Sequence, residues 1–181
     1  EHRGSQAQAD LAVAKARDLL VASRTRLVNC IRGTVKSFGE RLPTCTAESF
    51  HRQARVGVPD SLKPALEPLF EALEAIGRQI ARHEKTLKQI AKRYPDVELV
   101  SQPNGVGLLT ALVFMLTVED KTRFEKSRQA GAFLGMVPRR DQSGATDTQW
   151  HITKAGDPFV RRVRVCSANY ILGPFGSDSG G

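Results

Sequence analysis

One polar stretch carries the residue types from which a phosphoryl-transfer site could be built. It reads RRDQSGATDTQWHITKAGD over residues 139–157. Ser143 precedes a glycine, and Arg139, Arg140 and Lys154 add positive charge. A serine that attacks phosphorus needs an accessible hydroxyl, cations on the non-bridging oxygens and a proton acceptor. Ser143 is therefore a candidate nucleophile, and the two arginines and the lysine are candidate phosphate ligands.

The residues by themselves favour a plainer interpretation, in which Ser143 is an ordinary turn serine. Asp141, Asp147 and Asp157 are near it in the sequence but form no histidine–carboxylate relay, and His151 is a weak candidate for the proton acceptor. The whole stretch reads as a surface loop, with a strand at most around TQWHIT.

A second candidate site is the stretch PNGVGLLTA, where Gly105 and Gly107 precede an apolar segment. Glycines let the backbone turn tightly, so that the first amides of the next helix can face a phosphate. This arrangement is typical of a helix-hairpin-helix-like turn that holds a nucleic-acid backbone without reading its sequence. A plain turn before a buried helix is the alternative.

Charge favours a polyanionic partner. The chain has 27 Lys and Arg against 19 Asp and Glu, for a net charge of +8. Ten basic and four acidic residues lie between Lys121 and Arg164, among them Arg161, Arg162 and Arg164. This cluster favours DNA or RNA over a membrane, with a merely solvated surface as the alternative.

The remaining bulk features predict a cytoplasmic protein. No apolar run approaches the roughly 18 residues that span a bilayer, and no leader segment opens the chain. Cys30, Cys45 and Cys166 are far apart and form no metal-binding pattern, so we expect free thiols and no bound metal.

Helical periodicity dominates the rest of the chain. Residues 5–38 predict one long amphipathic helix, and residues 62–94 carry a heptad seam. The seam steps alternately by four and three residues through Leu62, Leu66, Leu69, Leu73, Ile76, Ile80, His83, Leu87, Ile90 and Tyr94. We expect a coiled coil that pairs two subunits; a packing helix inside a monomer is the alternative.

Shorter helices are expected in the last part of the chain. The apolar segment 108–118, a short helix before Pro138 and a helix from Pro158 are predicted, the last with Asp157 as N-cap. Its apolar stripe would be Phe159, Val163, Cys166 and Tyr170. The predicted fold is mainly α, with residues 1–58 as helical remnant of a preceding domain, 59–95 as coiled-coil helix and 96–181 as a small helical C-terminal domain.

Several segments, in this order, resemble one known family. They are LVNCIRGTVKSFGERLPTC at 27–45, GVGLLTALVFMLTVEDKTRF at 105–124, AFLGMVPRRDQSG at 132–144, ITKAGDPFVRRV at 152–163 and NYILGPFGSDS at 169–179. Together they resemble the middle and C-terminal part of the bacterial insertion-sequence transposases of the IS-one-ten and IS-eleven-eleven class, which includes the Piv DNA invertase.

The resemblance implies a function and a domain plan. Such proteins have an N-terminal resolvase-like domain with a DEDD set of acids, a coiled coil that pairs subunits, and a C-terminal transposase domain with a serine nucleophile. Ser143 is the serine that matches by position. Mg²⁺ is expected in the N-terminal domain and no cofactor in this chain, and some members use a structured bridge RNA.

We therefore expect a fragment of a DNA transposase or site-specific recombinase. Its acids would lie upstream of Glu1, so the chain, which looks truncated at both ends, is expected to be inactive alone. The alternative function is a non-catalytic nucleic-acid-binding and dimerisation module. It would hold phosphates through the turn at Gly105 and Gly107 and through the arginines at 161–164.

Overall fold

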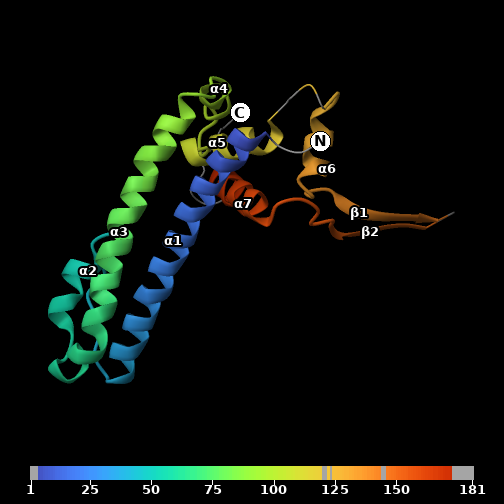
Figure 1. The fold of residues 1–181 in the computed structure, drawn as a ribbon. Coiled ribbons are helices and arrows are strands. Elements are labelled where there is room, and N and C mark those ends of the chain that lie inside the picture. Colours follow the sequence, from blue (N-terminus) through green and yellow to red (C-terminus); the bar gives the residue numbers. More distant parts are fainter. Residues whose placement is uncertain (1–3, 120–121, 123, 144–145, 173–181) are drawn as a thin grey trace. The chain divides into compact units, whose positions relative to one another are not determined.

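The computed structural model describes residues 4–119, 122, 124–143 and 146–172. For 127–128, 140–143, 146–149 and 169–172 it describes the backbone alone. The described chain is mainly helical with one two-stranded antiparallel sheet, which confirms the predicted fold class (Figure 1). It divides into two compact units, one of residues 12–88 and one of residues 1–11 with 89–181.

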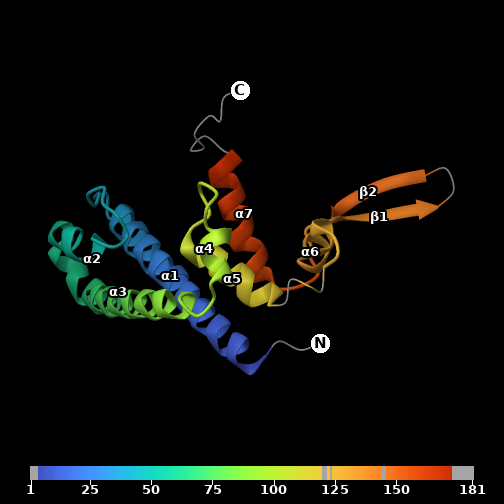
Figure 2. The same ribbon diagram turned by 90° about the horizontal axis from the view of Figure 1, so that it is seen from above.

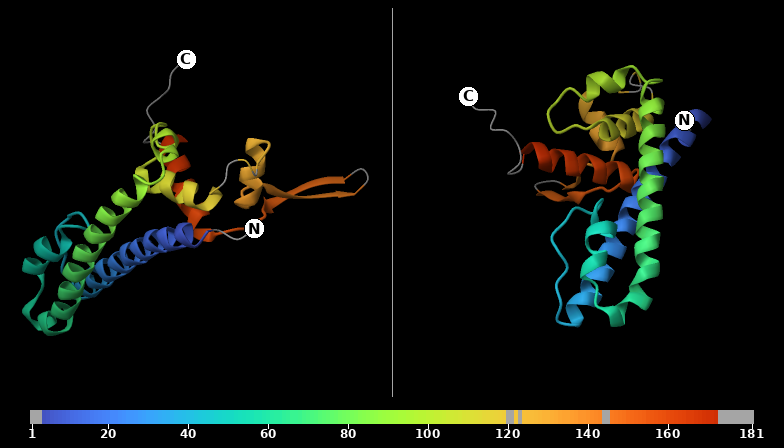
Figure 3. Two further views of the ribbon diagram at one scale, coloured as in Figure 1. Left: turned by 45° about the horizontal axis from the view of Figure 1, so that its top comes forward. Right: turned by 90° about the vertical axis from the view of Figure 1, so that its left-hand side faces the viewer.

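The first unit, residues 12–88, is built on two long helices. Most of α1 (Ser5–Ser37) and α3 (Lys63–Ala91) belong to it, and α2 (Phe50–Gln53) with the 3₁₀ turns η1 (Arg55–Gly57) and η2 (Asp60–Leu62) connects them (Figure 3). One core joins these elements because each turns an apolar stripe inward. Its buried members are Val28, Ile31, Val35, Phe50, Ala54, Val58, Leu62, Leu66, Phe70 and Leu73.

The heptad seam of α3 is used inside the chain, at least at its start. Leu62, Leu66 and Leu73 are buried in the same core as Val28 and Ile31 of α1. This packing supports the alternative of an internal helix, because an apolar side chain buried here is not available to a partner. The pairing of two subunits through residues 62–94 stays a prediction.

The second unit holds the remaining elements. They are α4 (Asp96–Val100), α5 (Leu108–Val118), α6 (Ser127–Phe133), β1 (Pro138–Ser143), β2 (Thr146–Ile152) and α7 (Pro158–Leu172). α5 contacts both α4 and α7 (Figure 2). It is apolar on all sides and buried, as expected for a central helix; Ala111, Leu112, Val113, Leu116 and Val118 are inaccessible to solvent or nearly so.

A buried carboxylate joins the two chain segments of the second unit. Asp10 is 3% exposed, and it accepts hydrogen bonds from Arg93 at 2.6 Å and from the Tyr94 hydroxyl at 2.7 Å. Gln6 donates a third at 3.1 Å. Burial, together with this hydrogen bond, raises the pKa of Tyr94 to about 12. Its contribution to stability is therefore present below pH 10 and lost as the pH rises through about 12.

The prediction of a surface loop over residues 139–157 is wrong for most of that range. β1 and β2 form an antiparallel hairpin, in which Asp141 pairs with Thr148 and Ser143 with Thr146. Only the segment around TQWHIT was considered for a strand. The hairpin was missed because its sequence is polar and lacks the alternation of apolar and polar residues that marks a half-buried strand.

The predicted apolar stripe of α7 is also partly wrong. The helix begins at Pro158 as expected, and Asp157 accepts the Phe159 N–H at 2.9 Å. However, Val160 is fully buried beside Phe159, whereas Cys166 is exposed. The stripe is therefore rotated by about one residue, because contact with α5 sets which side of the helix is covered.

The base of the hairpin depends on two glycines with left-handed backbones. Gly135 has φ +67° and Gly156 has φ +77°. A Cβ on Gly135 would overlap the Ala155 backbone, and one on Gly156 would lie 2.8 Å from the Phe133 carbonyl oxygen. The Lys154 N–H donates to the Gly135 carbonyl at 3.1 Å. The connections on the two sides of the hairpin therefore touch backbone to backbone.

Two sequence expectations concern the cellular setting. All three cysteines are free in the structure, as predicted. None of the described helices is both long and apolar enough to cross a membrane.

Gly135→Ala should destabilise the protein by at least about 2 kcal/mol, because a left-handed residue with a Cβ is strained and this Cβ also meets backbone. Gly131→Ala is the matched control: Gly131 lies in α6 with no atom within 4 Å of a Cβ. It should stabilise by about 0.5–1 kcal/mol. Urea denaturation followed by circular dichroism measures both, and equal stabilities would contradict the close backbone contact.

Asp10→Ala should cost about 2–3 kcal/mol, since it leaves Arg93 and Tyr94 without their buried acceptor. Glu74→Ala is the comparison, because it removes a carboxylate whose pair with Arg78 is exposed. That change should cost less than about 0.5 kcal/mol. If thermal or urea unfolding gave similar losses for both variants, the Asp10 network would not be a stabilising element.

Candidate nucleic-acid interface

The Gly-Val-Gly turn is a tight turn that leads into α5. The Val106 N–H donates to the Pro103 carbonyl at 3.0 Å, and Gly105 has φ +87°, which favours glycine. Gly107 has φ −73°, and its carbonyl accepts the Ala111 N–H at 3.1 Å, the first bond of α5. The sequence prediction of a turn before an apolar helix at 108–118 is confirmed.

The start of α5 has the properties of an anion site. In any α-helix the first-turn N–H groups have no partner within the helix, and the helix dipole makes this end positive. No atom lies within 4 Å of the place where a Cβ of Gly107 would be. An anionic group could therefore approach the backbone closely at this position. Whether the turn binds phosphate as a helix-hairpin-helix does stays a prediction.

A small cavity lies next to this turn. It measures about 250 Å³ and is lined by residues of the turn, α5 and α7. The hydroxyls of Thr110 and Ser167 lie 3.0 Å apart, and the Arg164 guanidinium lies over the Phe114 ring at 4.4 Å from its centroid. These contacts pack α5 against α7.

The three arginines of α7 have different surroundings. Burial lowers the pKa of Arg164 below its usual range. Arg161 donates to the carbonyls of Ala155 and Gly156, at 2.5 and 2.9 Å. Arg162 is exposed and lies 5.7 Å from the Phe159 ring centroid. Because its side chain is exposed, Arg162 is accessible to a phosphate.

The hairpin places Ser143 at the last position of β1, paired with Thr146 at the start of β2. The side chains of Ser143 and Arg140 lie outside the described part, so their contacts are untested. Arg139 is four strand positions from Ser143, which corresponds to about 14 Å. Lys154 follows Thr146 by eight positions, about 27 Å at the same rise. The structure does not bring Arg139 and Lys154 together at Ser143.

Lys154 occupies the base of the hairpin instead. Its φ is +56°, and its backbone N–H is bonded to Gly135, so its position is set by the close backbone contact described above. The side chain is exposed. Lys154 and Arg139 therefore suit phosphates that are distant from the one next to Ser143.

A cluster that the sequence analysis did not single out lies on the hairpin. Trp150 is 57% exposed, and with Arg139 and His151 it lines a cavity of about 380 Å³. His151 was considered only as a proton acceptor for Ser143. Trp150 could have been noticed from the sequence, since it is the single tryptophan of the chain and stands in a polar stretch.

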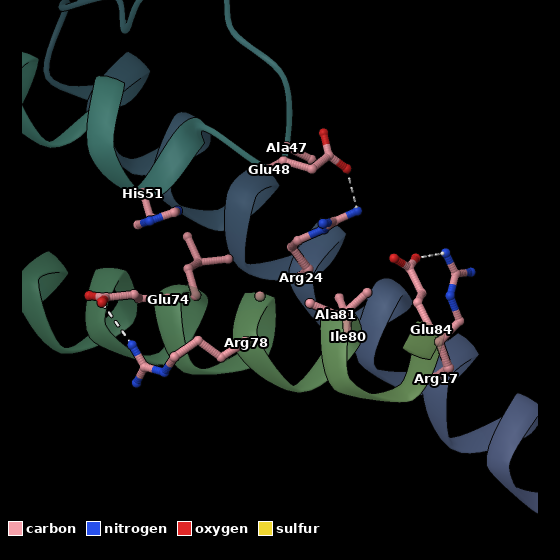
Figure 4. A pocket seen from close by; sticks show the side chains of 12 residues that line it. Arg17, Arg24, Ala47, Glu48, His51, Glu74, Arg78, Ile80, Ala81 and Glu84 are labelled. Carbon is pink, nitrogen blue, oxygen red and sulfur yellow. Dashed lines mark hydrogen bonds and ion pairs between the residues drawn. The ribbon is translucent and has the colours of Figure 1, made fainter. Parts of the chain in front are cut away.

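The largest cavity among those described lies in the other unit, between α1, α2 and α3 (Figure 4). It measures about 550 Å³, and its arginines are paired with glutamates. The pairs are Arg17–Glu84 at 2.7 Å, Arg24–Glu48 at 2.8 Å and Arg78–Glu74 at 2.7 Å. Because the opposite charges neutralise each other in this cavity, it is a poor site for an anionic ligand.

No group of three or more histidine, cysteine, aspartate or glutamate side chains gathers within the described residues. The residues that the structure describes thus provide no metal cradle.

Comparison with known proteins adds what geometry alone does not. Residues 97–170, from α4 to near the end of α7, match the Transposase IS116/IS110/IS902 family. A transposase for insertion sequence element IS1111A from Coxiella burnetii is 35% identical over 89% of this chain and 46% of its own length. Residues 97–170 are therefore a transposase domain of this family, and most of the chain is similar to its insertion-sequence transposases. The resemblance drawn from the sequence is confirmed.

Two further relatives agree. A transposase for insertion sequence element IS1328 from Yersinia enterocolitica is 31% identical over 93% of this chain and 52% of its own length. A probable family 20 transposase from Pseudomonas aeruginosa is 24% identical over 94% of this chain and 52% of its own length. The chain thus spans about half the length of these relatives. The segment that matches the transposase family includes both the turn before α5 and the hairpin with Ser143.

Gly107→Ala should weaken binding of duplex DNA without loss of stability, because a methyl group fits the backbone there but blocks close approach of a phosphate. A loss of about three- to tenfold in affinity is expected, the size of one typical hydrogen bond. Gly105→Ala is the comparison, since its positive φ makes it lose stability as well. Fluorescence anisotropy with a labelled duplex measures affinity, and unchanged affinity of Gly107→Ala would exclude the backbone contact.

Proposed function

We propose that this chain is the DNA-binding and strand-joining part of an insertion-sequence transposase. The observation that carries the proposal is the family match over residues 97–170, which includes the turn before α5 and the hairpin with Ser143. The relatives named as transposases support the same activity. The chain covers only about half of their length, so activity of the whole protein is part of the proposal.

DNA would be held mainly through its backbone. The amides at the start of α5 and the exposed Arg162 offer contacts to phosphates, and the net charge of +8 adds general attraction. Such contacts fix position without reading bases. They also suit the alternative function, a nucleic-acid-binding and dimerisation module. The seam of α3 gives little support to dimerisation, because part of it packs inside the chain.

The chemical step proposed for Ser143 is a transesterification. Its Oγ attacks the phosphorus, a bond from Oγ to phosphorus forms, and the bond from phosphorus to one sugar oxygen breaks. The proton of Oγ passes to a base, and the released sugar oxygen gains a proton. A hydroxyl of another strand then attacks the same phosphorus and frees the serine. The number of phosphate ester bonds stays constant, so no energy source is needed.

Distance determines which groups can assist this step. His151 follows Thr146 by five positions, about 17 Å at the rise of a strand. It is therefore too far from Ser143 to accept its proton within the same hairpin, and Arg139 is too far to touch the same phosphate. We propose that the proton acceptor comes from the half of the relatives that this chain does not cover, and that Arg140, the candidate phosphate ligand nearest to Ser143 in the sequence, supplies the cation.

Three further expectations from the resemblance remain proposals. Mg²⁺ would be bound outside this chain, and we derive no step through it because the described residues offer no cluster of ligands for it. A structured bridge RNA and a second subunit are the other expected partners.

Ser143→Ala should abolish formation of a covalent protein–DNA complex, because alanine has no oxygen with which to attack phosphorus. The assay uses this chain within a protein of the relatives' full length, with nicked element-junction DNA, guide RNA and Mg²⁺, and a denaturing gel. The unaltered protein should give a shifted band, and the variant should give none.

The control is Ser37→Ala, which removes a hydroxyl from the exposed end of α1, bonded only to its own helix at the Thr34 carbonyl as far as the described contacts go. It should keep the band. DNA binding, measured in the same samples, should be unchanged in both variants. Strand exchange that continued in Ser143→Ala would exclude this serine as nucleophile.

A further inference from the structure

Trp150 is a tryptophan that lies largely exposed to solvent on the hairpin. It is the only one in the chain, and 57% of its surface is exposed on β2. Ile152, on the same strand, is 40% exposed. Single exposed apolar side chains are common and need no explanation. Trp150 does need an explanation, because charged and aromatic groups gather around it and because the strand has an unusual shape there.

A β-bulge brings these groups together. Pro138 pairs with Ile152, and the next pair is Arg140 with Gln149, so the register shifts by one residue between them. Two residues of β2, Trp150 and His151, therefore stand opposite one residue of β1, Arg139. A bulge of this kind redirects side chains and is common near functional sites.

The three side chains border a hollow in the surface. Its volume is about 380 Å³, and Ile152 and Thr153 complete its lining. This volume falls within the roughly 300–1,000 Å³ of small-ligand sites. An indole offers a flat face for stacking, and a guanidinium binds phosphate or stacks on a ring. An imidazole adds a hydrogen-bonding edge.

We propose that this bulge site binds an unpaired nucleotide, with the base stacked on Trp150 and the phosphate held by Arg139. The inference rests on the proposed function, because it assumes that the transposase-family segment meets nucleic acid. The ligand is a single-stranded nucleotide of DNA or RNA, which share the base and the phosphate. His151 lies at the edge of the base.

Two properties favour an unpaired nucleotide over other ligands. In a duplex both faces of each base are covered by neighbouring pairs, so an indole has nothing to stack on unless a base leaves the helix. Stacking of bases on exposed aromatic side chains beside cations is how proteins hold single strands without reading sequence. A protein partner would suit a wider apolar patch that lacks the Arg139 charge.

The position of the site gives it a role near the bond that Ser143 attacks. The bulge lies about 14 Å from Ser143 along the hairpin. At 3.4 Å for each nucleotide of a stacked strand this distance corresponds to about four nucleotides. Strand exchange leaves bases unpaired close to the broken bond, and a base held at Trp150 would keep that strand in place while its end is free.

The single tryptophan makes a direct test available. The chain is titrated with an oligo-dT strand of ten nucleotides, with a blunt-ended duplex that has no loop, and with an abasic strand of equal length. Trp150 emission should be quenched by oligo-dT, and only slightly by the duplex and the abasic strand. Oligo-rU, run in parallel, shows whether DNA or RNA binds better.

Two variants are compared with the unaltered chain by anisotropy of a labelled strand. Trp150→Ala should lose between about 5- and 100-fold in affinity for oligo-dT, and Trp150→Phe should lose less, because one stacked base contributes that much. Leu19→Ala, which trims another exposed apolar side chain, should change nothing. Arg139→Ala should reduce the salt slope by about 0.7, and Arg139→Lys should restore it.

Three results would overturn the inference: no binding of oligo-dT, binding without any change in Trp150 emission, or equal affinity of Trp150→Ala and the unaltered chain. If duplex binding persists in any of these cases and depends on Gly107, the proposed function stands and only the nucleotide site fails. If neither duplex nor single strand binds, both proposals fail.

Discussion

The hairpin that carries Ser143 depends on one close contact between two stretches of backbone. Gly135 and Gly156 both have left-handed backbones, and at each of them the Cβ of a larger residue would meet the opposing segment of backbone. This contact brings the end of α6 next to the start of α7. Because backbone contacts fix the base of the ribbon, its position there does not depend on the side chains of the strands.

The rise of a β-strand then determines how the charges on this ribbon are used. Residues that are close in the sequence lie apart along a strand, because each position adds about 3.4 Å. Lys154, Arg139 and Ser143 therefore follow one another from the base of the ribbon to its turn. Such an arrangement suits a strand of nucleic acid, whose phosphates are also spaced in a line, better than a single phosphodiester.

Helices were the part of this fold that the sequence predicted well. Periodicity was sufficient for α1, α3 and α5, and the cap at Asp157 for the start of α7, because helix formation depends on neighbours in the sequence. The hairpin and the facing side of α7 were not predicted. Both depend on contacts between residues farther apart in the sequence, Pro138 with Ile152 across the hairpin and Thr110 with Ser167 between helices.

Prediction from the sequence has the same limit for the charged residues of the candidate site. Arg161, Arg162 and Arg164 look alike in the sequence, yet one binds backbone carbonyls, one is exposed and one packs on an aromatic ring. Charge counts predicted a nucleic-acid partner, but they cannot separate an arginine that stabilises the fold from one that binds. The bulge at Trp150 was equally hidden, since a register shift of one residue leaves no mark in composition.

The distances along the hairpin also bear on how much of the reaction this chain can perform. A serine hydroxyl is a weak nucleophile at neutral pH unless a base takes its proton and a cation offsets the growing charge. His151 and Arg139, the groups of these kinds next to Trp150, lie about 14–17 Å from Ser143. The chain would then hold DNA and present the nucleophile, while His151 and Arg139 are too far away to activate it. Such a division would keep Ser143 inert until all parts of the transposase meet on the same DNA.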